Sequence, residues 1–425
     1  MVIIRRAFFI IIGLFPLFTY SQNTINLIDL YKAVDINNPL AKIPSGIDSI
    51  YQLKSSNIRT SYLPKLDLNA SATWQSEVTS INLPSTLPFS IPETDKDQYK
   101  VSFDVSQLIW DGGTTRAREK MEDLNKVLEQ NKVNIEIYNV KDRITNLYFN
   151  LLLIKVTEDQ LYLMSNELDK RIAELESGVK AGYILSSTLD VIKAEKLKIL
   201  QNIDAIPTQR KSLISSLKSL TGIPLNDNDT YLIPNPDTLN SLNCLRPEYN
   251  GFRMQQDALT ASSNLIARKR YPVLAGFASA GYGKPGLNMM SNEWNTYYMF
   301  GAKLSWNIWD WNSVHKEKQQ LKLQANTVGL RERSYLDSYQ AQVDGILLEI
   351  QKLKNQLSKD KEIVQLLHKV SETSASSLKN GSITSSVYIS DFDSESRAQL
   401  EMEIRRIRLS LQRVMLYNLT GNELK

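Results

Sequence analysis

Two hydrophobic periods alternate along this chain and predict its elements. In residues from about 64–74, apolar side chains occupy every second position. Because successive side chains of a strand point to opposite faces, this period of two predicts a β-strand with one apolar and one polar face. The same alternation predicts three further strands, at about 99–110, 272–282 and 298–309.

Longer segments place apolar residues at alternating steps of three and four. Between Ile144 and Leu175, eight of ten such positions are apolar, and the segment from Leu189 to Leu220 repeats the spacing. A sustained average of 3.5 residues is typical of coiled-coil seams. No Pro or Gly occurs from Thr114 to Ser177. At 1.5 Å per residue, we expect one helix about 95 Å long there.

Matching motifs recur at fixed distances and predict a tandem duplication. Ile-Trp-Asp ends at Asp111 and again at Asp310, and Leu-Thr-Gly ends at Gly222 and again at Gly421; both pairs are 199 residues apart. Upstream motifs, such as the two copies of Ala-Ser-Ala, lie 208 apart, so the first copy has a longer loop between Trp74 and Tyr99. The distance between matching motifs is constant on each side of this loop, which indicates internal repetition.

The repeat divides the chain into a leader, two similar units and a bridge. Arg5, Arg6 and the apolar run that follows are typical of a signal peptide, and Pro16 and the short run disfavour the alternative, a transmembrane anchor. The predicted units are a signal peptide at 1–22, a first repeat at 23–222, an irregular equatorial bridge at 223–245 and a second repeat at 246–425.

Composition narrows the possible chemistry. The chain has 17 Gly in 425 residues, and few turn formers are expected where helices are long. Two His and one Cys cannot supply a usual structural zinc site, so we expect no metal and no cofactor. No catalytic constellation stands out, which predicts a protein that is not an enzyme. The net charge of +4 comes from interspersed charges, so no nucleic-acid partner is expected.

One-sided strands fit a membrane β-barrel, with an ordinary β-sandwich as the alternative. Aromatic residues cluster mostly near the predicted strand ends, where the membrane–water interface would lie. They are Trp74, Tyr99, Trp110, Tyr282, Tyr298, Trp306 and Trp309. Four strands cannot close a barrel, and open sheet edges are not tolerated in lipid, so a membrane protein of this pattern must oligomerise.

Several motifs together resemble the TolC-type outer-membrane efflux proteins. They are Tyr-Leu-Pro at 62–64 with Arg-Tyr-Pro at 270–272, Leu-Ile-Trp-Asp-Gly-Gly at 108–113, and Arg-Pro-Glu at 246–248. Their order and paired spacing carry the resemblance, which covers essentially the whole mature chain. It implies a homotrimer in the outer membrane of a Gram-negative bacterium, reaching into the periplasm. Four strands per protomer would form a twelve-stranded barrel in lipid, above a coiled-coil helical tunnel.

The resemblance also implies a function and partners. A protein of this family passively conducts substrates delivered by an inner-membrane pump, of the RND or ABC type, through a periplasmic membrane-fusion adaptor. Tripartite drug efflux, metal efflux and type I secretion all use such a component, and the sequence leaves the cargo open. The competing hypothesis is a periplasmic coiled-coil adaptor or structural protein with a β-domain outside the membrane.

In that family the helix turns form the periplasmic tip and contact the adaptor. The turns here are at about 178–187 and 378–386. The implied contact residues are Gly178, Gly182, Ser186, Ser187, Gly381, Ser385 and Ser386. Relatives place a carboxylate gate shortly after the second tip, but Val387 and Ser390 occupy the expected positions. Asp391 and Asp393 are therefore gate candidates, and Asp190 of the first repeat is a weaker one.

Overall fold

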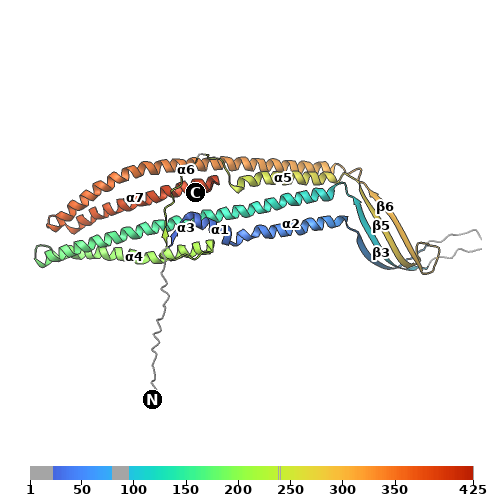
Figure 1. The fold of residues 1–425 in the computed structure, drawn as a ribbon, viewed down its shortest axis with the longest axis horizontal. Helices are drawn as coiled ribbons and strands as arrows, with labels where there is room; N and C mark the ends of the chain where they lie inside the picture. The colour runs from blue at the N-terminus through green and yellow to red at the C-terminus, as the bar shows by residue number, and fades with distance from the viewer. Residues whose placement is uncertain (1–22, 79–94, 238, 240, 425) are drawn as a thin grey trace, which may run out of the picture.

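The computed structural model describes residues 23–78, 95–237, 239 and 241–424. The predicted signal peptide lies outside these residues, as does most of the longer first loop. The protein is elongated, with a β-sheet at one end, two helical hairpin turns at the other and a short equatorial region between them (Figure 1).

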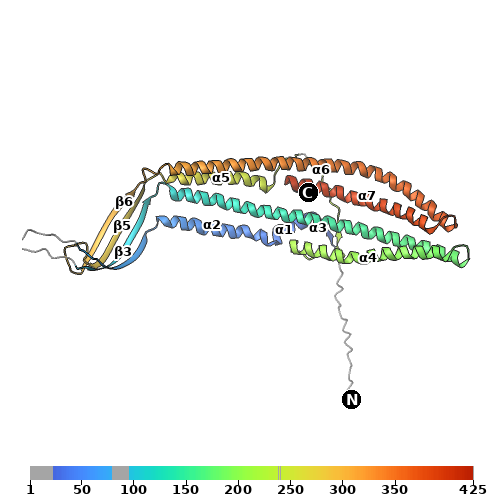
Figure 2. The same cartoon turned by 180° about the vertical axis from the view of Figure 1, so that it is seen from behind.

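Helices make up most of the length, and in the half next to the sheet α2, α3, α5 and α6 lie side by side in that order (Figures 1 and 2). The helices are α1 Leu27–Asn37, α2 Ile43–Arg59, α3 Thr114–Lys180, α4 Ser186–Thr221, α5 Pro247–Arg268, α6 Ser313–Lys379 and α7 Ser385–Thr420. In the described parts of the chain, no helix combines the length and the apolar character needed to cross a membrane.

The two halves of the chain contain elements of equal length. α3 and α6 each have 67 residues, and α4 and α7 each have 36. At 1.5 Å per residue, α3 and α6 are each about 100 Å long. This confirms the long helix expected from the absence of Pro and Gly, and α3 pairs with α4 as α6 pairs with α7.

Hydrophobic seams hold each hairpin together, and the polar residues within those seams are paired. Near the turns, Leu168 and Leu175 of α3 pack with Ile192 and Ile199 of α4 in one buried cluster. The seam position Glu158 is buried and accepts a hydrogen bond from Arg210 of α4 at 2.8 Å. Asp360 of the second hairpin is likewise bound by Arg405. A buried carboxylate is tolerated in an apolar seam because a guanidinium satisfies it.

The equatorial region surrounds the middle of α3. Strand β1, Thr24–Ile25, pairs in parallel with β4, Thr230–Tyr231, which lies in the predicted bridge. The Tyr148 hydroxyl of α3 lies 2.9 Å from the Ile25 carbonyl and 2.6 Å from that of Leu232. One side chain therefore ties both strands to the long helix.

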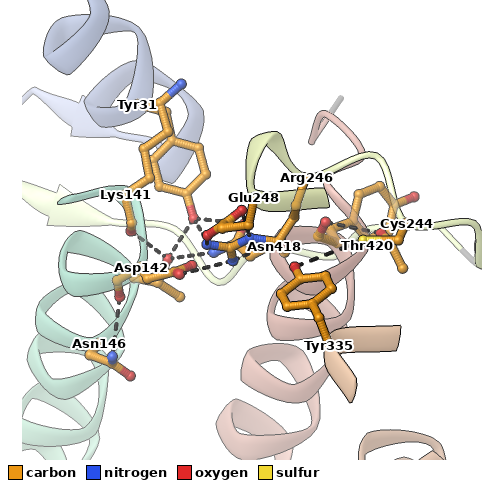
Figure 3. A network of polar contacts seen from close by, with 12 residues as sticks. Tyr31, Lys141, Asp142, Asn146, Cys244, Arg246, Glu248, Tyr335, Asn418 and Thr420 are labelled. Atoms are coloured by element: carbon orange, nitrogen blue, oxygen red, sulfur yellow. Dashed lines mark hydrogen bonds and ion pairs between the residues drawn. The ribbon is translucent and has the colours of Figure 1, made fainter. Parts of the chain in front are cut away.

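Arg246 joins three helices at the start of the second repeat. Its guanidinium donates to Glu248 of α5 and to Asp142 of α3, and it reaches the Asn418 carbonyl near the end of α7 (Figure 3). It also lies over the ring of Tyr138, 5.3 Å from the centroid. The Arg-Pro-Glu motif is thus a buried junction between the two halves.

The sheet contains four antiparallel strands in the order β2–β3–β5–β6. Their bounds are β2 Lys65–Trp74, β3 Asp97–Trp110, β5 Val273–Lys284 and β6 Asn295–Ser305. The predicted end of the fourth strand at 309 is therefore wrong, and Trp306 and Trp309 lie beyond β6. Ser305 pairs with Val273, and the preceding residue, Pro272, has no N–H with which to continue the ladder.

Candidate functional site: the apolar sheet face, the helix corners and the hairpin turns

One face of the sheet is apolar across all four strands. Leu68 of β2 pairs with Phe103 of β3, which pairs with Ala280 of β5 and, through it, with Tyr298 of β6. The next row toward the helices repeats the pattern with Leu66, Val105, Ala278 and Phe300. The side chains of Leu68, Phe103 and Phe300 are exposed in the single chain. A broad apolar face without a cover marks an interaction surface.

The opposite face is polar across β2 and β3. In the row next to Leu68, Asn69 pairs with Ser102, and its amide donates to the Asp104 carboxylate. Asp67 pairs with Asp104 itself. The two faces therefore differ most sharply on β2 and β3, whereas on β5 and β6 the second face also carries Phe277 and Met299.

The predicted interface aromatics are all exposed and lie mostly toward the two ends of the sheet. Trp74, Tyr99 and Tyr282 lie at the loop end, Trp110, Trp306 and Trp309 lie at the helix end, and Tyr298 lies between them. Eleven residues separate Tyr99 from Trp110 along β3, which is about 36 Å of strand. A strand tilted by about 40° would then span about 28 Å, close to the lipid band of a membrane barrel.

The sequence analysis missed one of the aromatic residues at the loop end of the sheet. Trp294, in the loop before β6, stacks on Tyr282 at 5.1 Å and on Tyr99 at 5.9 Å between ring centroids. It lies outside any alternating segment, so the strand pattern gave no signal for it. It lies four residues before the predicted start of the fourth strand at about 298, and this proximity to a strand with aromatic residues is the signal that was available.

Both edges of this layered structure are open. β2 and β6 are the outer strands of the sheet, and α2 and α6 are the outer helices of the adjoining layer. On α2, Ile50 and Leu53 are exposed, and on α6 Leu323 and Leu330 are exposed. One side of the chain therefore presents the free edge of β2 and exposed apolar residues of α2, and the other presents the free edge of β6 and exposed apolar residues of α6.

The repeated aspartate of the Trp-Asp motif builds the corner between sheet and helix. Asp111 accepts hydrogen bonds from the backbone N–H of Gly113 and of Thr115, at 2.9 and 2.6 Å. The Tyr62 hydroxyl donates to it at 2.8 Å. Burial alone raises the pKa of the Asp111 carboxyl, but these hydrogen bonds outweigh it and hold the pKa below its usual value. Asp310 binds the N–H groups of Asn312 and Val314 in the second repeat.

The hairpin turns have similar backbones in both repeats. Gly182 has φ +81° and Gly381 has φ +73°, and a Cβ on either would contact nothing within 4 Å. The Gly182 N–H donates to the Val179 carbonyl at the end of α3, and the Gly381 N–H donates to the Leu378 carbonyl at the end of α6. Their role is therefore to adopt a left-handed conformation. Gly178 differs, because a Cβ there would lie 2.4 Å from Ile184 Cδ1.

The predicted turn serines do not share one environment. Ser186, Ser187 and Ser386 are exposed, but Ser385 is buried. Around them, Tyr183 and Leu185 of the first turn and Val387 after the second are exposed apolar side chains. The turns thus present apolar groups that the residue pattern had not singled out.

Replacing Gly182 with Val is expected to cost about 1–2 kcal/mol at the turn, because a β-branched residue is strained at positive φ. In a strain whose drug resistance depends on this protein, drug sensitivity should rise while the amount of assembled protein on native gels is unchanged. Gly345→Val is the matched control, since Gly345 lies within α6, has no positive φ and also has open space around its Cα. Equal drug sensitivity in the two variants would contradict a role for the turn conformation.

The three gate candidates occupy different positions. Asp391 is half-buried and accepts a hydrogen bond from Ser374 of α6, so it links the two helices of one hairpin. Asp393 is half-buried, and burial together with the nearby charge of Glu195 on α4 raises the pKa of its carboxyl. Asp190 is exposed on α4. The structure therefore does not bring the three carboxylates together within one protomer.

A groove of about 790 Å³ runs between α3, α6 and α7 near the turns. A chain of polar contacts crosses it from one hairpin to the other. His368 Nδ1 of α6 lies 2.7 Å from Glu395 Oε1 of α7, Gln399 donates to Glu395, and Gln160 of α3 donates to Gln399. Glu372 lies 3.5 Å from His368 Nε2. In the sequence, His368 stands alone beside the predicted coiled-coil seam, so nothing predicted its contact with Glu395.

The stability of this region is expected to fall as pH rises. The hydrogen bond and charge of Glu395 raise the pKa of His368 above 6.5. A raised pKa means that the protonated form stabilises the fold below about pH 6.5 and that this contribution disappears as pH rises through the folded-state pKa. Other charged groups lining the groove are Glu167, Lys170, Arg171 and Glu372.

Thermal unfolding of wild type and His368→Gln across this pH range tests that sign. The wild type should melt at a higher temperature than the variant at acid pH, and the two curves should converge at alkaline pH. A constant difference across the range would show that protonation of His368 does not contribute.

Comparison with known proteins gives matches only at the level of structure. No protein-family model and no curated protein sequence matches the chain. The solved structure of CusC superposes with a TM-score of 0.73 and 11% identity, over 93% of this chain and 92% of that one. The Campylobacter jejuni CmeC outer membrane channel gives 0.68 and 14%, over 94% and 86%. The outer membrane protein VceC from Vibrio cholerae gives 0.68 and 15%, over 94% and 97%.

The chain has the TolC-type channel fold. The match extends over nearly the whole length of both proteins in the CusC and VceC comparisons, so the sheet, the equatorial region and both hairpins belong to one shared architecture. The identity to these structures is only 11–15%. In this chain the hydrophobic seams, the corner aspartates and the Arg246 junction all contribute contacts to the fold.

Proposed function

We propose that this protein is the outer-membrane channel-tunnel subunit of a tripartite efflux or type I secretion system in a Gram-negative bacterium. The observation that carries the proposal is a four-stranded sheet with one continuous apolar face, joined directly to helices about 100 Å long. The apolar face would meet lipid and the polar face would line water. The similarity to solved outer-membrane channels supports this assignment.

A homotrimer would remove both open edges at once. Three sheets of four strands make twelve strands if β2 of one protomer pairs with β6 of the next. The threefold rotation that pairs β2 with β6 would also bring the exposed apolar residues of α2 against those of α6 in the next protomer. Closure is required in lipid, because unpaired backbone groups at a sheet edge have no water to bind there. Tandem duplication of one strand–hairpin unit would explain the equal lengths of the two halves.

In this proposal transport through the chain is passive, and its partners supply energy and direction. The hairpin turns lie at the end opposite the sheet (Figure 1), where a periplasmic adaptor would meet them. The exposed Tyr183, Leu185 and Val387 offer that adaptor an apolar contact. An inner-membrane pump of the RND or ABC type would deliver the cargo.

The native mass of protein extracted by detergent from an outer-membrane fraction tests the proposal. A mass of three mature chains, after subtraction of bound detergent, would support the closed barrel. A soluble periplasmic monomer would overturn it and would favour a coiled-coil adaptor or structural protein with a β-domain outside the membrane.

Within this proposal, Asp393 is a better gate candidate than Asp391. Asp391 is held by Ser374 in its own hairpin, whereas Asp393 lies between hairpins, near Glu195. Asp393→Asn should therefore raise single-channel conductance in planar bilayers or weaken block by divalent cations, with Asp204→Asn, at an exposed position of α4, as the control. Unchanged traces for Asp393→Asn would remove this residue from the gate.

A further inference from the structure

Two adjoining grooves lie just below the sheet, on one face of the helical layer. The first, of about 740 Å³, runs between α3 and α5, and the second, of about 500 Å³, runs between α5 and α6. Thr260 and Asn264 line both grooves. The two grooves therefore open on the same side of α5 and form one continuous surface.

This surface is strongly basic. We define the basic collar as Arg116, Lys120, Arg268, Lys318 and Lys322, which line the two grooves. Among the described residues that line them, Asp257 is the one carboxylate. His315 also lines the second groove.

The charges of the basic collar are not neutralised within the protein. Among the described residues, none of its five cations forms an ion pair. Lysines near the hairpin turns behave differently, since Lys193, Lys196 and Lys198 each bind a carboxylate within 3 Å. Uncompensated cations concentrated in grooves indicate a surface that binds an anion supplied from outside the chain.

The basic collar lies directly below the helix-end aromatic group. Arg116 is the third residue of α3 and Lys322 the tenth of α6, so the collar lies within about 15 Å of the helix starts. Between β6 and α6, Trp309 and Trp311 are 71% and 79% exposed. Exposed tryptophans at such a boundary mark the level of lipid headgroups. Arg116 and Arg268 are therefore nearest the depth where phosphates of the adjoining leaflet occur, and Lys120, Lys318 and Lys322 extend the basic surface away from it.

We propose that the basic collar binds anionic phospholipids of the membrane leaflet next to the helices, through their phosphate groups. Arginine and lysine are the side chains that bind phosphate, as a bidentate fork and as a point charge respectively. The proposal rests on the membrane function proposed above. Its consequence is that lipid headgroups fix the height of the protein in the membrane.

Displacement of an acyl-labelled phosphatidylglycerol from the detergent-solubilised wild-type protein tests the proposal. Fluorescence anisotropy reports the bound label, and unlabelled phosphatidylglycerol and phosphatidylcholine compete for it. We expect phosphatidylglycerol to compete about tenfold more strongly, because each nearby cation favours an anionic headgroup. Rising salt should reduce that preference. Equal competition by the two lipids would overturn the proposal.

A charge-matched pair of variants localises the effect. Arg116→Gln/Lys120→Gln/Arg268→Gln/Lys318→Gln should abolish the preference. Lys170→Gln/Lys193→Gln/Lys196→Gln/Lys198→Gln removes the same charge near the turns and should leave it intact. Loss of preference in both would assign it to net charge and overturn the collar. If the first variant does not assemble, Lys318→Gln/Lys322→Gln, at two exposed positions of α6, should still weaken the preference, and an unchanged preference would overturn the proposal.

Two further results separate the possible sources of error. Displacement of the label by millimolar inorganic phosphate alone would identify a site for soluble anions and contradict a lipid site. Protein recovered from the outer membrane as a trimer but without lipid preference would refute only the collar. Protein absent from that membrane would refute the proposed function itself.

Discussion

Leu68→Arg is expected to prevent stable assembly in the outer membrane. Leu68 lies on the apolar face, in the same row as Phe103, near the middle of the sheet. If the apolar face meets lipid as proposed, placing Arg near the middle of the bilayer costs about 2–4 kcal/mol per copy, and the proposed trimer would carry three copies. The amount of assembled protein on native gels and the yield in the outer-membrane fraction should both fall strongly.

The neighbouring change, Asn69→Arg, is the control with opposite orientation. Asn69 faces the polar side, where Asp104 and Asp67 are close enough to accept the new cation. Assembly should therefore be nearly normal. Equal loss in the two variants would mean that the faces do not separate lipid from water, and a sandwich packing of the sheet would become the better model.

Arg246→Ala is expected to destabilise the fold by about 3 kcal/mol. Only 8% of Arg246 is exposed. Burial alone lowers the pKa of its guanidinium, but the hydrogen bonds that it donates to Glu248 and the charges of Asp142 and Glu248 raise that pKa overall. Removing the cation leaves both carboxylates uncompensated, which costs about 3–5 kcal/mol for a fully buried group. We expect the lower end because Asp142 is partly exposed to screening water.

Thermal and denaturant unfolding, followed by helical circular dichroism, measures this loss. Arg246→Lys retains the charge but not the forked geometry and should fall between wild type and Ala. Lys269→Ala is the external control, since its ion pair with Glu317 is exposed and is worth at most about 0.5 kcal/mol. Similar losses for Arg246→Ala and Lys269→Ala would show that the junction does not stabilise the fold.

Local patterns were sufficient to predict the main elements. The long helix α3 and the turn glycines follow from residues close together in the chain, because hydrophobic period, helix breakers and positive φ are local properties. The strands were placed within a few residues, except at Trp306 and Trp309. There the limit was set by Pro272, more than 30 residues earlier, which cannot donate to the ladder.

The candidate site was only partly accessible from the sequence. The turn positions could be predicted, but the exposed Tyr183 and Leu185 were missed because their exposure depends on how the turn between α3 and α4 folds against the helix ends. Asp391 and Asp393 look equivalent in the sequence. The fold places one against Ser374 in its own hairpin and the other near Glu195 of another.

By itself, the sequence determined the order and approximate lengths of the elements, since these depend on the preferences of neighbouring residues, and it predicted their repetition. Tertiary structure alone decided how the strand rows align into one apolar face, that Arg246 joins three helices, and that His368 meets Glu395. It also gathered the basic collar from α3, α5 and α6. These contacts join residues far apart in the chain, and their geometry depends on the register and packing of whole elements rather than on any local pattern.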